Sequence, residues 1–254
     1  MRLGAGPLFV ATLLLLALLP APLAGAADLA VFSAGAMEPG LRRLVPGFER
    51  ETGHAVTLTI AVPNVLRQRV QAGESPDLLI APPPVVDALT QTGRLRPEGR
   101  VVVGRVGVAV VVRSGAPVPD VSSPEALRRA LLDCESLVFN RASTGTYFER
   151  VLEGMSIADA VRAKSVRYPD GNAVMEHVIR GTGREIGIGP ITEIRPYETR
   201  GLRFVGPLPA PIQNHTSYVA TLLAGRPEDG PAAAFVRYIS SPAARGVFAE
   251  TGVE

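Results

Sequence analysis

Four short segments combine small residues with hydroxyl or amide side chains, the residue types that hydrogen-bond an anion without a metal. Each follows an apolar segment and precedes one with helical periodicity: 33–36, 61–64, 141–147 and 170–172. The first backbone N–H groups of a helix have no partner inside the helix, and they favour negative charge. The four segments are therefore candidate anion-binding turns, although Ser, Thr and Asn also serve as ordinary helix caps.

Catalytic chemistry has less support in the sequence. Ser143, Asp170 and His215 could form a hydrolytic triad, but the G-x-S-x-G turn that exposes a nucleophilic serine is absent. Cys134 is the only cysteine, which excludes an intrachain disulfide and a zinc site built from several thiolates. The three histidines lie far apart in the sequence, without metal-ligand spacing. We expect a binding protein rather than an enzyme, with no metal and no cofactor.

The four candidate turns can form one site only if strands and helices bring them to the same edge of a sheet. In the first part of the chain, strand and helix patterns alternate, with strands expected at 27–33, 55–60 and 76–81 and helices at 37–52, 64–72 and 85–92. The alternation returns later, with strands at 136–140, 165–168 and 185–189 and helices at 144–155, 157–163 and 172–180. This order is typical of βαβ units, whose ligands bind at the carboxyl ends of the strands. Pro46 is expected to kink the first helix or delay its start.

Two long β segments interrupt the alternation. The segment 101–112 is almost entirely apolar and is expected to be broken by Gly104 and Gly107, and a second long segment spans 214–223. A chain that passes from a first lobe to a second along one of these segments, and returns along the other, makes two lobes with a hinge between them. Ser123 and Ser241, each followed by proline, predict the starts of two further helices.

Three more side chains are candidates for contact with a ligand. Tyr147 and Tyr218 are expected to pack in the core, and the alternative is that either faces a ligand. His215 lies where the chain is expected to return between the lobes, so it is a candidate cleft residue.

The composition is that of an ordinary globular protein. Of 254 residues, 46% are hydrophobic and 20% are charged, which excludes wholesale disorder. The 26 basic and 24 acidic residues give a net charge of +2, too small a surplus for a nucleic-acid-binding surface. Attraction for a charged ligand must therefore come from the local arrangement of groups.

The N-terminus indicates export. Arg2 precedes an apolar run at 8–19, and the small residues at 24–26 form an A-x-A pattern. The apolar run is shorter than the roughly 20 residues that span a bilayer, so a transmembrane anchor is the weaker alternative. We interpret residues 1–26 as a secretory signal peptide, cleaved after Ala26 or Ala27.

Six stretches together resemble a known family. They are LAVFSAGAMEPGLRRLVPGFERETGHAVTLTI, PDLLIAPPPVVDALTQTGRL, VVVRSGAPVPDVSSPEAL, GREIGIGPITEI, LRFVGPLPAPIQ and AAAFVRYISSPAARGVFAETGV. In order and spacing they are similar to the periplasmic solute-binding proteins of ABC importers, most closely the molybdate-binding (ModA-like) branch. The resemblance covers essentially the whole chain after residue 26.

The resemblance implies an α/β fold of the type II periplasmic binding protein class. Two lobes, each a mostly parallel sheet flanked by helices, would be joined by two β crossovers and close on a ligand by hinge motion. The expected limits are 27–106 for lobe 1, 107–208 for lobe 2, and 209–254 for the return to lobe 1. It also implies a periplasmic monomer that binds a small anion and delivers it to an ABC importer permease in the inner membrane.

The family's molybdate-binding positions carry over only in part. They fall at Ala36, Pro63, Thr144, Gly171 and Pro190, so several oxyanion donors are replaced. Molybdate or a similar oxyanion remains the expected ligand, and a small organic acid, bound for import or sensing, is the alternative. Arg141 could pair with a carboxylate of such an acid. A secreted hydrolase is a remote alternative. The predicted ligand-binding residues are Ser33, Gly35, Ala36, Asn64, Arg141, Thr144, Gly145, Gly171 and Asn172.

Overall fold

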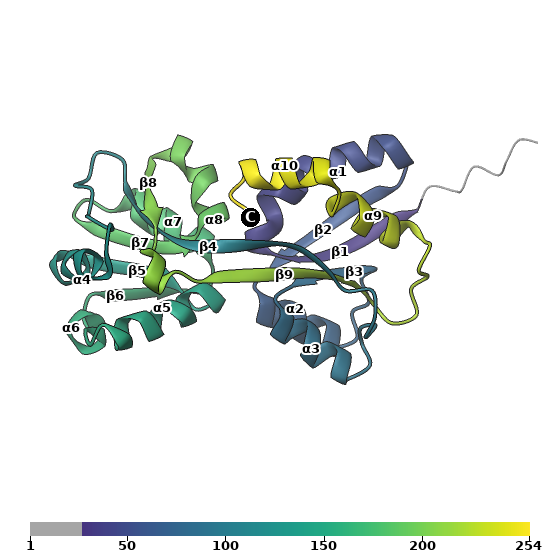
Figure 1. Cartoon of the computed structure of the whole chain (residues 1–254), viewed down its shortest axis with the longest axis horizontal. Coiled ribbons are helices and arrows are strands. Elements are labelled where there is room, and N and C mark those ends of the chain that lie inside the picture. The colour runs from purple at the N-terminus through teal and green to yellow at the C-terminus, as the bar shows by residue number, and fades with distance from the viewer. Residues whose placement is uncertain (1–26) are drawn as a thin grey trace, which may run out of the picture.

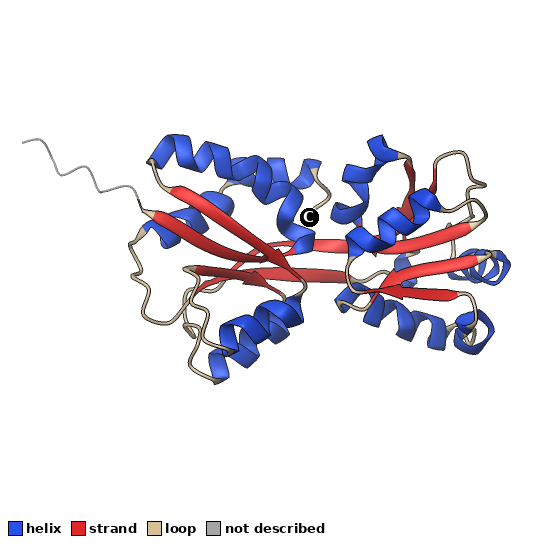
Figure 2. Ribbon diagram, turned by 180° about the vertical axis from the view of Figure 1, so that it is seen from behind, coloured by secondary structure: helices blue, strands red, loops and turns tan. Residues whose placement is uncertain are grey.

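The computed structural model describes residues 27–254, so the predicted signal peptide lies outside the described residues. These residues form two lobes that lie side by side and are joined by two long strands (Figure 1). Helices cover both faces of the sheet in each lobe, as the view from behind also makes visible (Figure 2). The two-lobed α/β fold expected from the sequence is therefore confirmed.

The first lobe is built around parallel pairing of β1 with β2 and with β3. Its elements are β1 (Asp28–Ala34), η1 (Gly35–Met37), α1 (Glu38–Thr52), β2 (Ala55–Ala61), α2 (Pro63–Gln71), β3 (Leu78–Ala81), α3 (Pro83–Gln91), α9 (Pro231–Ile239) and α10 (Pro242–Glu250). The turns after β1 and β2 therefore leave the same edge of the sheet.

The second lobe repeats this plan around parallel pairing of β5 with β6 and with β7. Its elements are α4 (Pro124–Asp133), β5 (Ser136–Asn140), α5 (Ser143–Gly154), α6 (Ala158–Arg162), β6 (Ser165–Tyr168), α7 (Gly171–Arg180), β7 (Glu185–Pro190), α8 (Ile191–Ile194), η2 (Arg195–Arg200), β8 (Leu202–Pro207) and η3 (Ala210–Ile212). The short segments α8 and η2 were not predicted from the sequence.

The crossovers are β4 (Val101–Arg113) and β9 (His215–Leu222), which pair antiparallel with their neighbours. The strand order is β2-β1-β3-β9-β4-β7-β5-β6, with β8 also paired to β4. Along β4 the partner changes from β9, up to Gly107, to β7, from Val108. The glycines do not end the segment, because β4 is one continuous strand, although its register with β9 shifts between Val102 and Gly104. Gly104 instead makes room for Val253, whose Cγ1 would lie 2.3 Å from an added Cβ.

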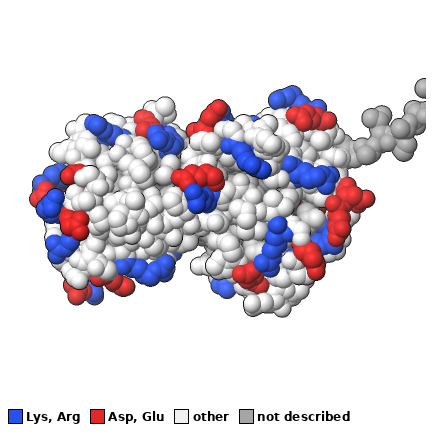
Figure 3. Space-filling view, viewed as in Figure 1, with Lys and Arg blue, Asp and Glu red and all other residues white. Residues whose placement is uncertain are grey.

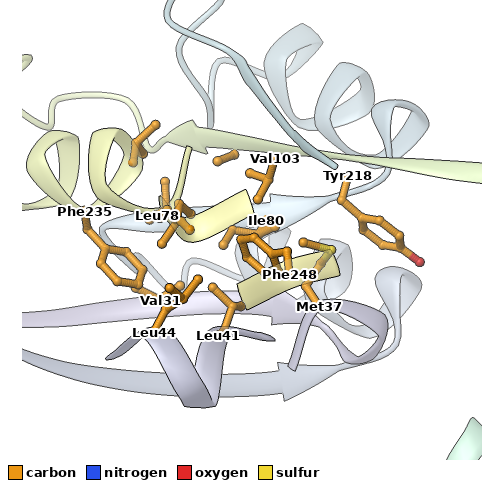
Figure 4. Close-up of a cluster of buried hydrophobic side chains, with 14 of the residues drawn as sticks. Val31, Met37, Leu41, Leu44, Leu78, Ile80, Val103, Tyr218, Phe235 and Phe248 are labelled. Atoms are coloured by element: carbon orange, nitrogen blue, oxygen red, sulfur yellow. The ribbon is translucent and has the colours of Figure 1, made fainter. Parts of the chain in front are cut away.

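Each sheet has a hydrophobic core on both faces. In the first lobe, one core lies under α1, α9 and α10, and the other under α2 and α3. Figure 4 shows the first of these, where Phe235 and Phe248 pack with aliphatic side chains from α1 and the strands. Burial on both faces explains why β3 is apolar throughout: all four of its residues are fully buried.

Local signals in the sequence locate several helix ends correctly. The Oγ atoms of Ser123 and Ser241 accept hydrogen bonds from Ala126 N (3.1 Å) and Ala244 N (3.2 Å). These bonds satisfy N–H groups that lack partners in the first turns of α4 and α10. Pro46 does not delay α1, which begins at Glu38 and runs through the proline.

The lone cysteine is part of the second-lobe core. Cys134 follows α4, is 6% exposed and lies against the cluster formed by α4, α5 and β5. Burial raises the pKa of its thiol, so the reactive thiolate form is disfavoured.

Charged side chains of both signs are interspersed on the face that Figure 3 shows, in keeping with the small net charge. Between residues 27 and 254, no helix is long and apolar enough to cross a membrane. The same residues contain no cluster of His, Cys, Asp or Glu suited to hold a metal ion.

Candidate ligand-binding cleft

The two lobes enclose a cavity of about 380 Å³. The first lobe and β9 supply one wall, formed by Ala34, Gly35, Ala36, Glu38, Ile60, Ala61, Val62, Pro63, Val65 and Tyr218. The second lobe supplies the other, formed by Asn140, Ala142, Ser143, Thr144, Pro169, Asp170, Gly171, Asn172, Pro190 and Glu193. The cavity therefore lies where hinge motion would open and close it.

Four helix N-termini reach this cavity. Residues at the starts of α2, α5 and α7 line it, as do Gly35 and Ala36 of η1, which leads directly into α1. These are the four turns that the sequence singles out, and the fold brings all of them together. Their first N–H groups have no partners within the helices and create positive potential in the cavity.

The second-lobe wall is held in place by hydrogen bonds within its own loops. The Oδ1 atom of Asn140, a buried side chain, accepts from Ala142 N (3.1 Å) and Gly145 N (3.0 Å). A Cβ added to Gly145 would lie 1.7 Å from the Asn140 carbonyl oxygen. Gly145 is thus needed for the close approach of β5 and α5 rather than for contact with a ligand.

The predicted site residues divide into two groups. Gly35, Ala36, Thr144, Gly171 and Asn172 line the cavity. The positions inferred from the molybdate-binding family all line it as well; they are Ala36, Pro63, Thr144, Gly171 and Pro190.

The other predicted residues lie outside the lining. Ser33 is fully buried in β1, and its hydroxyl donates to the Ala34 carbonyl oxygen (3.2 Å). Gly145 packs behind the wall against Asn140. Asn64 and Arg141 are exposed and are not among the lining residues, so neither reaches the cavity in this arrangement.

His215 also lies away from the lining. Its Nε2 atom is 3.4 Å from Glu254 Oε1, beside the crossover β4. Ser143 and Asp170 line the cavity, but His215 does not join them, so the hydrolytic triad is not assembled there.

The residue that sequence reasoning missed is Glu193. It lies on α8, directly after β7, and its carboxyl group reaches both lobes. A Cβ added to Gly171 would lie 1.6 Å from Glu193 Oε2, and one added to Gly35 would lie 3.2 Å from Oε1. The Oε2 atom is buried and has no hydrogen-bond partner among the described residues. The only signal in the sequence is an acidic residue within the apolar segment 191–194.

The environment of Glu193 favours its neutral form. Burial, followed by the nearby charges of Asp170 and Glu38, raises the pKa of Glu193 to about 7. The other two carboxylates have partners: Glu38 Oε1 accepts from Arg42 Nε at 2.6 Å, and Asp170 Oδ1 accepts from Ala173 N at 2.9 Å. Glu193 is thus the carboxyl group of this cavity that no described neighbour stabilises in its charged form.

Tyr218 lines the cavity beside this group, as the alternative interpretation allowed. It is 3% exposed, and Figure 4 shows its hydroxyl pointing away from the buried hydrophobic cluster. Burial, and then the charge of Glu193, raises the pKa of Tyr218, so its phenol stays protonated at neutral pH.

A family model described as bacterial extracellular solute-binding protein matches residues 29–254. The chain belongs to this family. The matched residues include every helix and strand that forms the cavity, apart from the first residue of β1.

One relative of this solute-binding protein is named as an enzyme. An aconitate isomerase from Pseudomonas sp. is 26% identical over 258 residues, which cover 99% of this chain and 95% of the relative.

Solved structures share the fold of this solute-binding protein. The periplasmic molybdate-binding protein of Azotobacter vinelandii superposes with a TM-score of 0.73 at 17% identity, covering 89% of this chain and 98% of its own. PEB3 of Campylobacter jejuni, in a structure with bound L-phospholactate, gives a TM-score of 0.69 at 12% identity, covering 89% and 99%. The family model therefore confirms that the chain is a bacterial solute-binding protein, and the solved structures confirm that it shares the fold of the periplasmic molybdate-binding protein.

Proposed function

We propose that this solute-binding protein is the periplasmic receptor of an ABC importer and binds a small organic acid between its lobes. The carboxylate groups of the acid would face the second lobe, and its carbon skeleton would face the first. The observation that carries this proposal is the difference between the two walls of the cavity.

The first-lobe wall offers an oxyanion few side-chain donors. Ala36, Ile60 and Val62 present apolar side chains, and Pro63 has no backbone N–H. Molybdate and sulfate carry oxygen atoms on every side, and each oxygen buried without a donor costs about 1–3 kcal/mol. An organic acid has polar ends and an apolar skeleton, which matches two walls of different chemistry.

The charge of the cavity also suits a small carboxylic acid. Among the described lining residues there is no Arg, Lys or His. Each helix N-terminus carries a partial positive charge, so the helix starts at the cavity together favour an anion. Glu38 is paired with Arg42, and Glu193, with a pKa of about 7, is about half protonated at pH 7. Asp170 and the ionised fraction of Glu193 offset part of this positive potential, so the carboxylates of a ligand are expected at the helix starts.

Delivery of the ligand would follow the pattern of the family. The expected partner is a permease in the inner membrane, and the expected state in solution is a monomer. The lobe limits predicted from the sequence, 27–106, 107–208 and 209–254, remain part of this proposal. A sensing role with the same ligand is the alternative to import.

Thermal melting of the protein, refolded to remove bound solute, tests the proposal. The panel contains molybdate, tungstate, sulfate and phosphate, and also phospholactate, cis- and trans-aconitate and the saturated tricarballylate. A ligand at 100 times its dissociation constant adds about 2.7 kcal/mol of stability, which raises Tm by several degrees. We expect shifts with organic acids, and shifts confined to molybdate and tungstate would contradict the proposal.

Two threonines of α5 provide a matched pair of variants for this experiment. Thr144 is buried and lines the cavity, whereas Thr146 is exposed and lies outside it. We expect Thr144→Val to weaken binding about tenfold through the loss of a hydroxyl. Thr146→Val should bind like the unchanged protein.

A second candidate function is isomerisation of the bound acid. The aconitate isomerase relative spans nearly the whole chain, so aconitate or a similar unsaturated acid is a reasonable substrate to test. The observation that favours this function is Glu193, whose Oε2 atom is buried without a hydrogen-bond partner among the described residues, in a cavity suited to carboxylates. It modifies the expectation from the sequence that the protein is not an enzyme.

A further inference from the structure

We propose that Glu193 is a catalytic residue, which takes a proton from one carbon of an unsaturated polycarboxylic acid and returns it to another carbon of the same molecule. This inference rests on the proposed binding of an organic acid in the cleft. It goes further in assigning the chemistry to one side chain and in defining the class of substrate.

The position of Glu193 is the first argument. Its carboxyl group lies against Gly171 at the start of α7 and near Gly35 at the start of η1, where the absence of side chains leaves room for it. A ligand held by the N-termini of α7 and α1 would therefore lie beside this carboxyl group. Both of its flanking glycines line the cavity.

The lack of a structural role is the second argument. Glu38 forms an ion pair with Arg42, and Asp170 caps α7, so both stabilise the fold. Glu193 forms no ion pair with a described residue, and its buried Oε2 atom has no hydrogen bond. A buried carboxyl group without a partner destabilises the folded state, and such groups concentrate at functional sites.

The third argument is that Glu193 can both accept and release a proton near neutral pH. The charged groups that act on it are Asp170, which caps α7, and Glu38 from α1, and the titratable Tyr218 of β9 lies beside it. Burial and the two carboxylates raise its pKa to about 7, the range in which a general base works efficiently. Tyr218 stays neutral beside it and adds no charge.

The substrate class follows from the reaction that one carboxyl group can perform. The acid must have a CH₂ group next to a carbon–carbon double bond that is conjugated with a carboxylate, as aconitate has. The Glu193 carboxylate takes a proton from the CH₂ group, and the C–H electron pair forms a new double bond to the central carbon. The electron pair of the old double bond moves onto the far carbon and into its carboxylate.

The far carbon then takes the proton from neutral Glu193. The double bond has moved by one carbon, and no oxidant, reductant or water is consumed. For aconitate this shift can exchange the cis and trans isomers. The N–H groups at the helix starts would stabilise the electron density that develops on the substrate carboxylates during the shift.

Proton NMR in D₂O tests this directly with cis- and trans-aconitate as probes. Neutral Glu193 exchanges its proton with solvent, so we expect deuterium in the CH₂ and vinyl positions together with interconversion of the isomers. Glu193→Gln should slow both by at least about 100-fold, since general acid–base catalysis contributes that much or more. The matched control is Glu198→Gln, an exposed residue outside the cavity, which should react at the unchanged rate.

Two further readouts separate catalysis from a structural role. Tricarballylate binds without reacting, and Glu193→Gln should retain its affinity within about threefold if the site stays folded. The value of kcat/KM should rise about tenfold per pH unit below pH 7 and level off above it, because the carboxylate is the reactive form.

The outcomes distinguish this inference from the proposed function. If tricarballylate or aconitate raises Tm but no deuterium enters aconitate, binding stands and the role of Glu193 is overturned. Exchange that survives in Glu193→Gln, or is lost only together with tricarballylate binding, also overturns it. If no organic acid in the panel binds, the proposed function fails and this inference fails with it.

Discussion

The two walls of the cleft share a backbone plan and differ in chemistry. Each is built from strand–turn–helix units with helix N-termini at the cavity. The first-lobe wall presents mainly alanine, isoleucine, valine and proline, whereas the second-lobe wall presents hydroxyl, amide and carboxyl groups. The backbone therefore supplies a general preference for anions, and the few side chains on the turns determine which anion fits.

The largest expected effect concerns the titration of Glu193, a side chain of the second-lobe wall. The folded-state pKa of about 7 lies above the ordinary value of 4.5, so the folded protein binds more protons than the unfolded chain between these values. With respect to this group, the free energy of unfolding is therefore highest below pH 4.5. It falls as the pH rises from 4.5 to 7 and levels off above pH 7. The loss is roughly 3 kcal/mol, at about 1.4 kcal/mol for each unit of pKa difference.

Urea unfolding at pH 5 and pH 8 measures this loss. Glu193→Gln should remove most of this loss of stability, and the variant should have a higher free energy of unfolding than the unchanged protein at pH 8. Glu198→Gln serves as the control. Equal pH dependence of stability in all three proteins would mean that Glu193 is solvated like a surface residue. The two walls would then not differ in the titration of a buried carboxyl group.

The next effect compares the glycines that flank Glu193 on the two walls. An added Cβ at Gly171 would lie 1.6 Å from Oε2, so Gly171→Ala must displace the carboxyl group into the cavity. At Gly35 the distance to Oε1 is 3.2 Å, which a small shift accommodates. Overpacking of this kind costs about 1–3 kcal/mol.

We expect Gly171→Ala to weaken tricarballylate binding by at least about tenfold and Gly35→Ala by about threefold or less. Titration calorimetry measures both. Thermal melting without ligand measures the overpacking cost separately, and we expect Gly171→Ala to lower Tm by a few degrees. Equal losses at the two glycines would argue against the second lobe as the wall that holds the carboxylates.

The smallest effect tests whether the first-lobe wall excludes oxyanions. Ala36→Ser places a hydroxyl at one of the positions that the resemblance to the molybdate-binding branch assigns to the ligand. One added hydrogen bond is worth about 0.5–1.5 kcal/mol, so molybdate affinity should rise about threefold to tenfold. Ala224→Ser, in an exposed turn outside the cavity, should leave it unchanged. No change in Ala36→Ser would show that the missing hydroxyl is not what limits oxyanion binding.

The sequence predicts the turns well because each is specified locally. A strand, a few small residues and a helix start follow one another in the chain, and parallel pairing brings the turns to one edge. The serine caps at Ser123 and Ser241 are equally local. The apolar character of the first wall is also visible in the sequence, at Ala36 and Pro63.

Glu193 could not be found in the same way. The helix α8 has four residues, too few for a hydrophobic period to appear. Burial of the carboxyl group depends on Gly35 and Gly171, which come from segments far away in the chain. Arg141 illustrates the same point, because its residue type suits a carboxylate while the tertiary structure leaves it exposed and outside the cavity lining.

The buried cysteine makes the protein convenient for optical detection of its ligand. Cys134 is enclosed in the second-lobe core and holds its proton, so thiol-directed dyes should leave it unmodified. A cysteine introduced in place of exposed Asn64, next to the cavity residues Pro63 and Val65, would then be the single labelling site. An environment-sensitive dye at this position would report closure of the lobes as a change in fluorescence, without removal of the native thiol.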